Sequence, residues 1–385
     1  MKIDHRDPWH WLLLALFSAN VLLGLLLRPF VRRDDRKVLL YGHKLNGNLL
    51  ALYLESDADD TGLELEFLTM DPLYWREIQR QGIRTTLAIS PRTAWLLARI
   101  DAVVTDHGLH AMTPLPKLTN IRFYDAWHGI PFKGFDSADF RAQHQYRETW
   151  VTSPHLKRLY VDRFGFRKDQ VVVTGYARTD RLLNTTESPE QARQQLGLPA
   201  DRKLILFAPT WAQDSRGRSV FPFGLDEVQF MGHLSVFAEQ HDCSILLRPH
   251  LNSPLSQSTK YPRVYLLPSK THPDTEQILL ASDVLVCDWS SIAFDFLLLN
   301  RPTIFLDVEP PFRKGFSLGP EFRFDKIVRG VHELQSALKD AILVPGITLR
   351  RHASRREEVT QTVYGEYADG NSAQRCLDRL TSARD

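Results

Sequence analysis

Runs of apolar residues alternate with polar turns along most of the chain, and these runs come in two kinds. The short runs are rich in Val, Ile, Leu and Phe and predict buried strands. The longer stretches between them carry apolar residues at helical spacing, as at 94–100 and 156–164. Strands are predicted at 37–41, 63–68, 86–89, 102–105, 122–126, 149–152, 171–174, 203–207, 244–247, 264–267, 284–287 and 303–306. This alternation predicts an α/β protein with parallel sheets wrapped by helices.

The length of the chain, 385 residues, favours two domains over one. Near residue 190 the pattern breaks, because Pro, Gly and Ser flank a short amphipathic turn. We therefore expect a first domain over 37–185, a linker over 186–201 and a second domain over 202–385. The carboxy-terminal part of the second domain, from 331 on, predicts helices.

The amino terminus has a different pattern from the rest of the chain. Residues 9–27 carry no formal charge and are dominated by Leu, close to the roughly 20 residues that cross a bilayer core. A cluster of Arg and Lys follows within 28–37. The positive-inside rule then predicts a membrane anchor with its basic flank over 1–36, in the inner (cytoplasmic) membrane with the body on the cytoplasmic face. A buried core helix is the alternative, and Ser18 and Asn20 leave open a helix that lies partly in the membrane interface.

Charge and cysteine content narrow the function classes. The formal net charge of +2 gives no reason to expect a nucleic-acid partner. Cys243, Cys287 and Cys376 are far apart, and their spacing is not that of metal ligands. We expect buried structural thiols in a reducing compartment and no metal site.

In the second domain, polar residues follow several predicted strands where each strand ends. The carboxyl ends of parallel strands gather along one edge of a sheet, which is where such sheets bind ligands. An Arg and a His beside two hydroxyls at a helix start suit a phosphate group. The alternative is that Asp288 or Ser290 only caps the helix that follows. The candidate residues are Thr210, Arg248, His250, Asp288, Ser290 and Ser291.

The first domain carries a second candidate at 125–135, DAWHGIPFKGF. His128 precedes a glycine, in a loop that cannot be helical across Pro131, and its ordinary pKa suits general-base catalysis. The alternative is a loop histidine held by a backbone carbonyl. Arg178 and Asp180 end another predicted strand, where a surface ion pair is the alternative. The polar loop GHKLNGN at 42–48 is a weaker indication of a ligand site.

Several motifs follow one another in order along 37–380. They are WHGIPFK from Trp127, GYARTDRL from Gly175, LFAPTW from Leu206, RPH from Arg248, CDWSSIAFDF from Cys287, and YADGNSAQR from Tyr367. This ordered set resembles that of the CDP-glycerol glycerophosphotransferase family, the teichoic acid type glycerol and ribitol phosphotransferases. The resemblance implies a GT-B fold, with two Rossmann-like domains facing across a cleft. It also implies a nucleotide held by the second domain and a last helix that crosses back towards the first.

Four positions depart from the pattern of that family. Ile130 and Phe132 replace threonine and leucine, Ala177 stands where proline is common, and Trp289 replaces a frequent tyrosine. None of these changes removes a titratable group. They put the identity of the acceptor in doubt more than the activity.

The family resemblance implies attack by an acceptor hydroxyl on the β-phosphorus of a CDP-alditol, with release of CMP. His128 is then the general base, and His250 contacts the pyrophosphate. The hydroxyls of Ser290 and Ser291 would hold phosphate oxygens. Arg178 and Arg248 would add positive charge. Thr210 and Asp288 would line or brace the nucleotide pocket. No cofactor and no metal is expected. The residues expected to bind substrate are Lys133, Arg178, Asp180, Thr210, Arg248, Asp288, Ser290 and Ser291.

The expected partners are CDP-glycerol or CDP-ribitol, a lipid-linked or glycan acceptor, and the membrane, with no nucleic acid. Two other functions stay open. One is a GT-B glycosyltransferase that uses a sugar nucleotide, since a fold does not fix a reaction. The other is a non-catalytic, membrane-anchored scaffold that binds a nucleotide.

Overall fold

The computed structural model describes residues 4, 6–58, 61–210, 221–249 and 261–382. The chain forms two compact units. Unit 1 comprises Met1–His128, Asp136–Asp180 and Tyr367–Asp385, and unit 2 comprises Gly129–Phe135 and Arg181–Glu366. This grouping differs from the predicted domain boundaries, because 129–135 falls in unit 2 and the last helix falls in unit 1.

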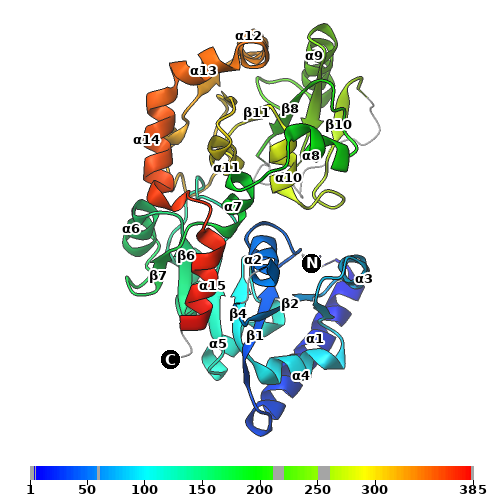
Figure 1. Ribbon diagram of the computed structural model, residues 1–385, viewed down its shortest axis with the longest axis vertical. Helices are drawn as coiled ribbons and strands as arrows, with labels where there is room; N and C mark the ends of the chain where they lie inside the picture. The colour runs from blue at the N-terminus through cyan, green and yellow to red at the C-terminus, as the bar shows by residue number, and fades with distance from the viewer. Residues whose placement is uncertain (1–3, 5, 59–60, 211–220, 250–260, 383–385) are drawn as a thin grey trace. The chain divides into compact units, whose positions relative to one another are not determined.

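Unit 1 is built on a seven-stranded parallel sheet with the strand order β3-β2-β1-β4-β5-β6-β7. The order reverses direction between β1 and β4, so this is the topological switch point of the sheet. Figure 1 shows helices on both faces of the sheet. The strands are β1 (Asp34–Tyr41), β2 (Glu64–Thr69), β3 (Thr85–Leu87), β4 (Ile100–Thr105), β5 (Arg122–Asp125), β6 (Glu148–Val151) and β7 (Val171–Val173).

The helices of unit 1 cover the two faces of this sheet. The α-helices are α1 (Pro8–Leu27), α2 (Gly47–Ala58), α3 (Pro72–Arg80), α4 (Pro91–Arg99), α5 (Leu115–Leu118), α6 (Pro154–Asp162), α7 (Ala177–Leu183) and α15 (Ser372–Ser382), of which α7 continues into unit 2. Short 3₁₀ helices lie at Arg28–Phe30, His110–Met112, Ser137–Phe140, Gln143–Gln145 and Gly365–Tyr367, the last at the boundary with unit 2.

Unit 2 repeats the same plan with a six-stranded parallel sheet of order β10-β9-β8-β11-β12-β13. Its switch point lies between β8 and β11. The strands are β8 (Lys203–Ala208), β9 (Cys243–Leu247), β10 (Val264–Leu266), β11 (Val284–Cys287), β12 (Thr303–Leu306) and β13 (Lys326–Val328). The helices are α8 (Pro189–Gln195), α9 (Glu227–Gln240), α10 (Thr275–Ala281), α11 (Ile292–Leu298), α12 (Val331–Leu343), α13 (Pro345–Arg351), α14 (Ala353–Val363) and the 3₁₀ helix Pro320–Phe322.

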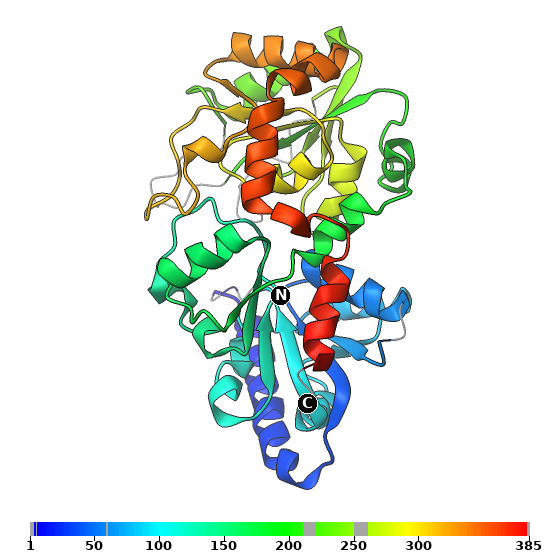
Figure 2. The same cartoon turned by 60° about the vertical axis from the view of Figure 1, so that its left-hand side comes forward.

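Both sheets bury their strands as the sequence pattern predicts. In β1, Leu40 belongs to one core cluster and Leu39 to another, because successive side chains point to opposite faces. The cluster of Leu40 includes residues of α2 and α15 (Figures 1 and 2), and that of Leu39 includes residues of α1 and α4. In unit 2, Phe207 packs with residues of α9 and α12. The predicted α/β class with parallel sheets is confirmed.

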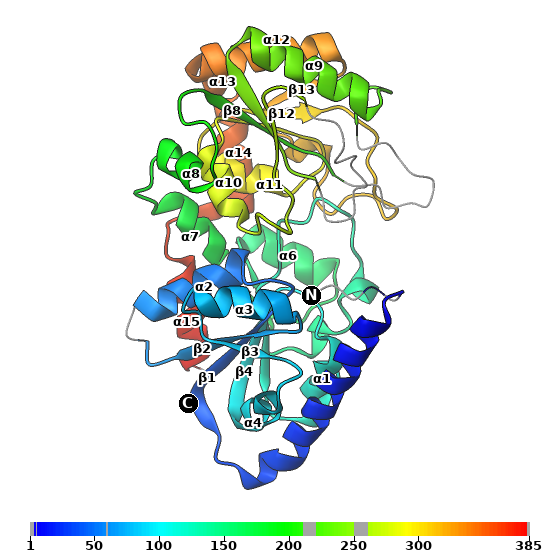
Figure 3. The ribbon, with the colours of Figure 1, turned by 90° about the vertical axis from the view of Figure 1, so that its right-hand side faces the viewer.

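Helix α1, at the amino terminus, lies along α4 on one face of unit 1 (Figures 1 and 3). Leu13, Phe17, Val21 and Gly24 are buried at this contact. At Gly24 the helices approach so closely that a Cβ would lie 3.0 Å from the main-chain oxygen of Ala94. One face of the predicted anchor is therefore packed like a core helix.

Two polar residues fix α1 to the same face. Asn20 Nδ2 donates to the main-chain oxygens of Ala88 and Ser90, at 2.9 and 3.0 Å. Arg28 Nη1 donates to the main-chain oxygen of Ile100, at 2.8 Å. Among the described residues, this is the one helix long and apolar enough to cross a membrane, by length and composition only.

Candidate active site

Three loops at the switch point of unit 1 meet beside one another. Strand β4 pairs with β1 and with β5, in a register that aligns Thr105 with Tyr41 on one side and with Asp125 on the other. The residues that follow these strands therefore emerge together at the carboxyl edge of the sheet. They include His43 after β1, His107 after β4 and His128 after β5.

His128 is the predicted general base of this loop cluster. Its Nδ1–H donates to the main-chain oxygen of Asp106 at 3.0 Å, so the alternative of a histidine held by a backbone carbonyl describes its geometry correctly. A carbonyl only accepts, so the contact places the proton on Nδ1 and leaves Nε2 as the basic nitrogen. The side chain is exposed. The same contact that holds the ring thus prepares it for base catalysis.

The surroundings of His128 favour its neutral form. Desolvation by the surrounding protein and the charge of His107 lower the pKa of His128 to about 4. The neutral form is the one that accepts a proton, so His128 is ready to act as a base at neutral pH. The charge of Arg178 contributes in the same direction.

The backbone beside His128 is strained. Trp127 has a φ of +41°, in the left-handed region that bulky residues rarely adopt. Its N–H donates to Asp125 Oδ1 at 3.1 Å, and its main-chain oxygen accepts from Asn48 Nδ2 at 2.8 Å. Strain of this kind persists where surrounding contacts over-determine a conformation, and it is common at functional sites.

Asn48 joins three segments at this site, although sequence reasoning assigned no role to it. Its Nδ2 also donates to the main-chain oxygen of Ala126 at 2.7 Å, and its Oδ1 accepts from the N–H of Arg178 at 3.0 Å. Asn48 is buried at the start of α2. The only sequence signal was the polar loop at 42–48, in which it is the last residue.

Arg178 and Asp180 have different roles in the structure. The Arg178 guanidinium is buried and lies over the Tyr176 ring, 5.0 Å from its centroid. Asp180 accepts from the N–H of Ala373 at 2.6 Å, at the start of α15. Arg178 thus lies close enough to act on His128 electrostatically, whereas the carboxylate of Asp180 contacts the last helix.

The switch point of unit 2 carries hydroxyls and a carboxylate. Strands β8 and β11 pair with Ala208 opposite Cys287, so Thr210 and Asp288 follow side by side. Asp288 Oδ1 accepts from the N–H of Thr210 at 2.9 Å and from its Oγ1 at 2.5 Å. The buried carboxylate therefore braces the loop after β8.

Ser290 and Ser291 stand directly before α11, half-buried. Ser291 is the N-cap residue, and its side chain makes no capping hydrogen bond. Within the part of the chain that the structure describes, neither hydroxyl has a hydrogen bond. The alternative named Asp288 or Ser290 as the cap of this helix, and neither of them is its N-cap residue.

Arg248 follows β9 at the same edge, but its guanidinium holds a neighbouring loop. Nη1 donates to the main-chain oxygen of His272 at 2.9 Å, and Nη2 donates to Thr275 Oγ1 at 2.8 Å. Desolvation lowers its pKa to about 10, so it remains charged at neutral pH. The other candidate of this loop, His250, lies outside the described residues.

Lys133 belongs to a segment, 129–135, that is part of unit 2. Its main chain pairs with Phe316, and its Nζ lies 5.2 Å from the centroid of the Phe135 ring. Phe132, one of the departures from the family pattern, contacts the ring of another, Trp289, edge-on at 6.1 Å. Since Ile130 and Phe132 are both buried, these changes are substitutions within a packed core.

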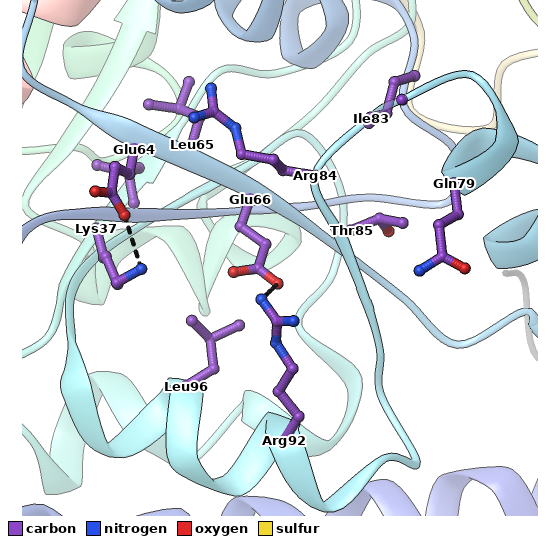
Figure 4. A pocket seen from close by; sticks show the side chains of 12 residues that line it. Lys37, Glu64, Leu65, Glu66, Gln79, Ile83, Arg84, Thr85, Arg92 and Leu96 are labelled. Carbon is purple, nitrogen blue, oxygen red and sulfur yellow. Dashed lines mark hydrogen bonds and ion pairs between the residues drawn. The ribbon is translucent and has the colours of Figure 1, made fainter.

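A cavity of about 330 Å³ lies at the opposite edge of the sheet of unit 1 (Figure 4). Lys37, Glu64 and Thr85, which line it, stand near the amino-terminal ends of β1, β2 and β3. Its charges pair with one another, as Lys37 with Glu64 at 2.8 Å and Arg92 with Glu66 at 3.0 Å. This cavity lies away from the loops that carry the candidate residues. In the described residues, no group of three or more His, Cys, Asp or Glu is placed to hold a metal ion.

Comparison with known proteins places this chain in a family. Residues 28–382 match the model of the CDP-glycerol:poly(glycerophosphate) glycerophosphotransferases. The chain belongs to this family. It is an enzyme that transfers an alditol phosphate from a CDP-alditol in the synthesis of wall polymers.

Curated relatives include enzymes for two alditols. The chain is 28% identical to a teichoic acid poly(glycerol phosphate) polymerase of Bacillus spizizenii, over 72% of this chain and 74% of the relative. It is 27% identical to a teichoic acid glycerol-phosphate transferase of Staphylococcus aureus, over 71% and 75%. With the teichoic acid ribitol-phosphate polymerase TarK of the same species it shares 26%, over 56% of this chain and 44% of the relative.

Solved structures support the fold. The wall teichoic acid polymerase TagF superposes with a TM-score of 0.72 at 16% identity, covering 98% of both chains. The two parallel α/β units are thus GT-B-like. A UDP-GlcNAc 2-epimerase from Neisseria meningitidis also superposes, with a TM-score of 0.53 at 14% identity, over 91% of this chain and all of the other. The fold alone therefore does not decide the reaction.

Proposed function

We propose that this enzyme transfers glycerol phosphate from CDP-glycerol to a hydroxyl of a membrane-associated acceptor, with His128 as general base. The observation that carries the proposal is the contact between His128 Nδ1 and the main-chain oxygen of Asp106, which leaves Nε2 basic. The family model that matches residues 28–382 is that of the CDP-glycerol:poly(glycerophosphate) glycerophosphotransferases. This match supports glycerol as the alditol.

The step transfers a phosphoryl group between two oxygens. The acceptor hydroxyl attacks the β-phosphorus of the donor and gives its proton to His128 Nε2. The bond from the β-phosphorus to the oxygen that bridges to the α-phosphorus breaks, and CMP leaves with that oxygen. A phosphodiester results. A base of this kind contributes about 100- to 10,000-fold to a rate.

Unit 2 supplies the groups for the nucleotide and its phosphates in this proposal. Ser290 and Ser291 have hydroxyls to offer to phosphate oxygens, and Thr210 is fixed beside them by Asp288. Arg248 braces the loop after β10 and adds positive charge to this edge. His250 stays a prediction for the pyrophosphate. Lys133 and Asp180 serve the packing of their segments.

We propose further that α1 lies in the membrane interface. One face of α1 is held on unit 1 by packing and by Asn20 and Arg28, so this helix meets lipid with its other face. That face is apolar, with Trp residues of the kind that settle at a membrane interface. Its exposed residues are Trp9, Trp11, Leu12, Leu16, Leu22, Leu23 and Leu26.

The function is tested by measuring CMP release from CDP-glycerol with a membrane lipid extract as acceptor. CDP-ribitol and a UDP-sugar serve as competing donors, and His128→Gln serves as the inactive variant. Release from CDP-glycerol that depends on acceptor and on His128 supports the proposal. Turnover of the UDP-sugar alone would instead establish a glycosyltransferase, and donor binding without any turnover would favour a scaffold.

A further inference from the structure

A second imidazole stands against the proposed base. His107 follows β4, and its ring is stacked on that of His128, with centroids 4.8 Å apart and planes 13° from parallel. Its Nδ1–H donates to Asp106 Oδ1 at 2.7 Å. The His107 side chain is 28% exposed, so a substrate can reach it, whereas Asp106 is buried.

One residue orients both rings. Asp106 accepts from His107 Nδ1 through its carboxylate and from His128 Nδ1 through its main-chain oxygen. Because both Nδ1 atoms face Asp106, both Nε2 atoms face away from it. The rings are stacked and nearly parallel, with centroids 4.8 Å apart, so the two imidazoles are close enough to act on one substrate.

The carboxylate of Asp106 occupies the space beside Gly42 that a side chain would otherwise fill. Gly42, after β1, approaches so closely that a Cβ there would lie 2.6 Å from Asp106 Oδ1. Any side chain at this position would displace the carboxylate from His107. The pair of Asp106 and His107 is therefore built into the packing of two adjacent strand ends.

The two imidazoles have opposite charge preferences. Desolvation lowers the pKa of His107, but the charge and hydrogen bond of Asp106 outweigh it, and the net pKa is raised. For His128 the pKa is lowered. His107 thus keeps its second proton to a higher pH than an ordinary histidine does, whereas His128 loses its second proton at a lower pH.

Other ionisable groups surround this pair. His43 lies 4.4 Å from the His107 ring, and His110 lies 5.9 Å from His43. Desolvation lowers the pKa of His110 to about 4, so it is neutral beside Tyr41. Buried Asp125 has a pKa raised to about 7 by desolvation, and the positive charge of Arg178, on α7, acts on His128.

We propose that His107 is a second catalytic imidazole, whose Nε2–H donates to an anionic oxygen of the phosphoryl group while His128 Nε2 accepts the proton of the attacking hydroxyl. This inference rests on the proposed function. His107 keeps its proton throughout, so the bonds that form and break are those of the transfer itself. Its charge offsets the negative charge on the phosphoryl oxygens in the transition state.

The test is the pH dependence of kcat/KM for CMP release from CDP-glycerol. His107 acts when protonated and its pKa is raised, so activity is expected to fall as pH rises through that pKa. His107→Leu should lower kcat/KM about 100-fold, the scale for losing one such donor. His107→Gln, which keeps an N–H donor without the charge, should recover part of the rate and lack the alkaline limb.

Asp106→Asn tests the role of the charged His107 without replacing either histidine. The main-chain oxygen that holds His128 remains, but His107 loses the carboxylate that raises its pKa. The alkaline limb should therefore move to lower pH, and Gly42→Ala should move it in the same direction by displacing the carboxylate. His110→Gln, in the same cluster but neutral, should leave the limb in place.

The outcomes separate this inference from the function on which it rests. An alkaline limb unchanged in His107→Gln and in Asp106→Asn, with His128→Gln inactive, overturns the role of His107 and leaves the proposed function standing. Full activity of His128→Gln overturns the proposed function itself. If His107→Leu fails to fold by circular dichroism, the limb in Asp106→Asn decides.

Discussion

The two switch points of this enzyme have the same topology and different chemistry. When the strands of each unit are counted in chain order, both sheets contain the order 3-2-1-4-5. Polar residues follow the first and the fourth strand of each unit. Unit 1 places imidazoles there, with His128 beside the Asp106–His107 pair. Unit 2 places hydroxyls and one buried carboxylate there, in Thr210 and Asp288. We therefore propose that the same topology serves proton transfer in unit 1 and anion binding in unit 2.

The two switch points differ in chemistry because their loops carry different ionisable groups in different surroundings. In unit 1, desolvation lowers the pKa of His128, whereas the interaction with Asp106 raises that of His107. In unit 2, the carboxylate of Asp288 is engaged with Thr210, and Ser290 and Ser291 contribute uncharged donors. We expect changes in unit 1 to act on turnover and its pH dependence, and changes in unit 2 to act on donor affinity.

The largest effect is expected for His128→Gln. Turnover should fall about 1,000-fold, because the general base is lost. Donor affinity, measured by calorimetry with CDP-glycerol, should change little. The matched control is His233→Gln on α9, an exposed histidine outside the site. A variant that lost donor binding and turnover together would mean that the two units do not divide these tasks.

Thr210→Val tests the other side of the comparison. It removes the hydroxyl bond to Asp288, a hydrogen bond to a charged group worth about 2 kcal/mol. The Kd for CDP-glycerol should rise about 10- to 30-fold, with the pH profile of kcat unchanged. Thr271→Val, an exposed threonine in the loop after β10, is the control. An altered acid or alkaline limb in Thr210→Val would contradict the division.

The proposed binding of α1 to the membrane interface is a further property of unit 1. Replacing Leu16 and Leu23 with Ser should lower the fraction of enzyme that sediments with anionic lipid vesicles. Each buried leucine is worth about 1 kcal/mol or more, so the partition coefficient should fall about 10-fold or more. Val228→Ser removes an even more exposed apolar side chain from unit 2 and should not change binding. Equal binding of all variants would argue against an interfacial α1.

The smallest expected effect is that of Arg178→Gln on the acid limb. His128 acts when neutral and its pKa is lowered to about 4, so activity should persist well below the ordinary pKa of histidine and be lost as pH falls towards 4. Removing the charge of Arg178 removes one cause of this lowering and should move the acid limb slightly upward. Arg178→Lys keeps the charge and should keep the limb. A downward shift in Arg178→Gln would show that this charge does not act on His128.

The local sequence pattern was enough to predict the strands and the edge of each sheet where the candidate residues lie. Buried parallel strands appear as short apolar runs, so each predicted strand overlaps an observed one. Among the described residues, β13 is the strand that was not predicted, because Lys326–Val328 is three residues long and begins with lysine. The direction of polar side chains was harder to predict. Arg248 stands at a strand end as expected, whereas Asp180 lies within α7, and each contacts the backbone of another segment.

The residues that sequence reasoning missed act through distant partners. Asn48 holds Arg178, 130 positions away, and no local motif marks such a contact. Asp106 and His107 follow an unremarkable strand, and only the pairing of β4 with β1 and β5 brings them to His128. Likewise, length and composition suit α1 equally to a bilayer and to a packed face. The contacts of Asn20 and Arg28 exist only in the folded unit.

The sequence by itself determined the strands, the parallel sheets, the family and the identity of the proposed base, because these depend on local periodicity and on ordered motifs. Only the tertiary structure decided which nitrogen of His128 is basic and that His107 lies against it. Tautomer and charge depend on atoms a few ångströms away in space, and here those atoms come from strands that are distant in the chain.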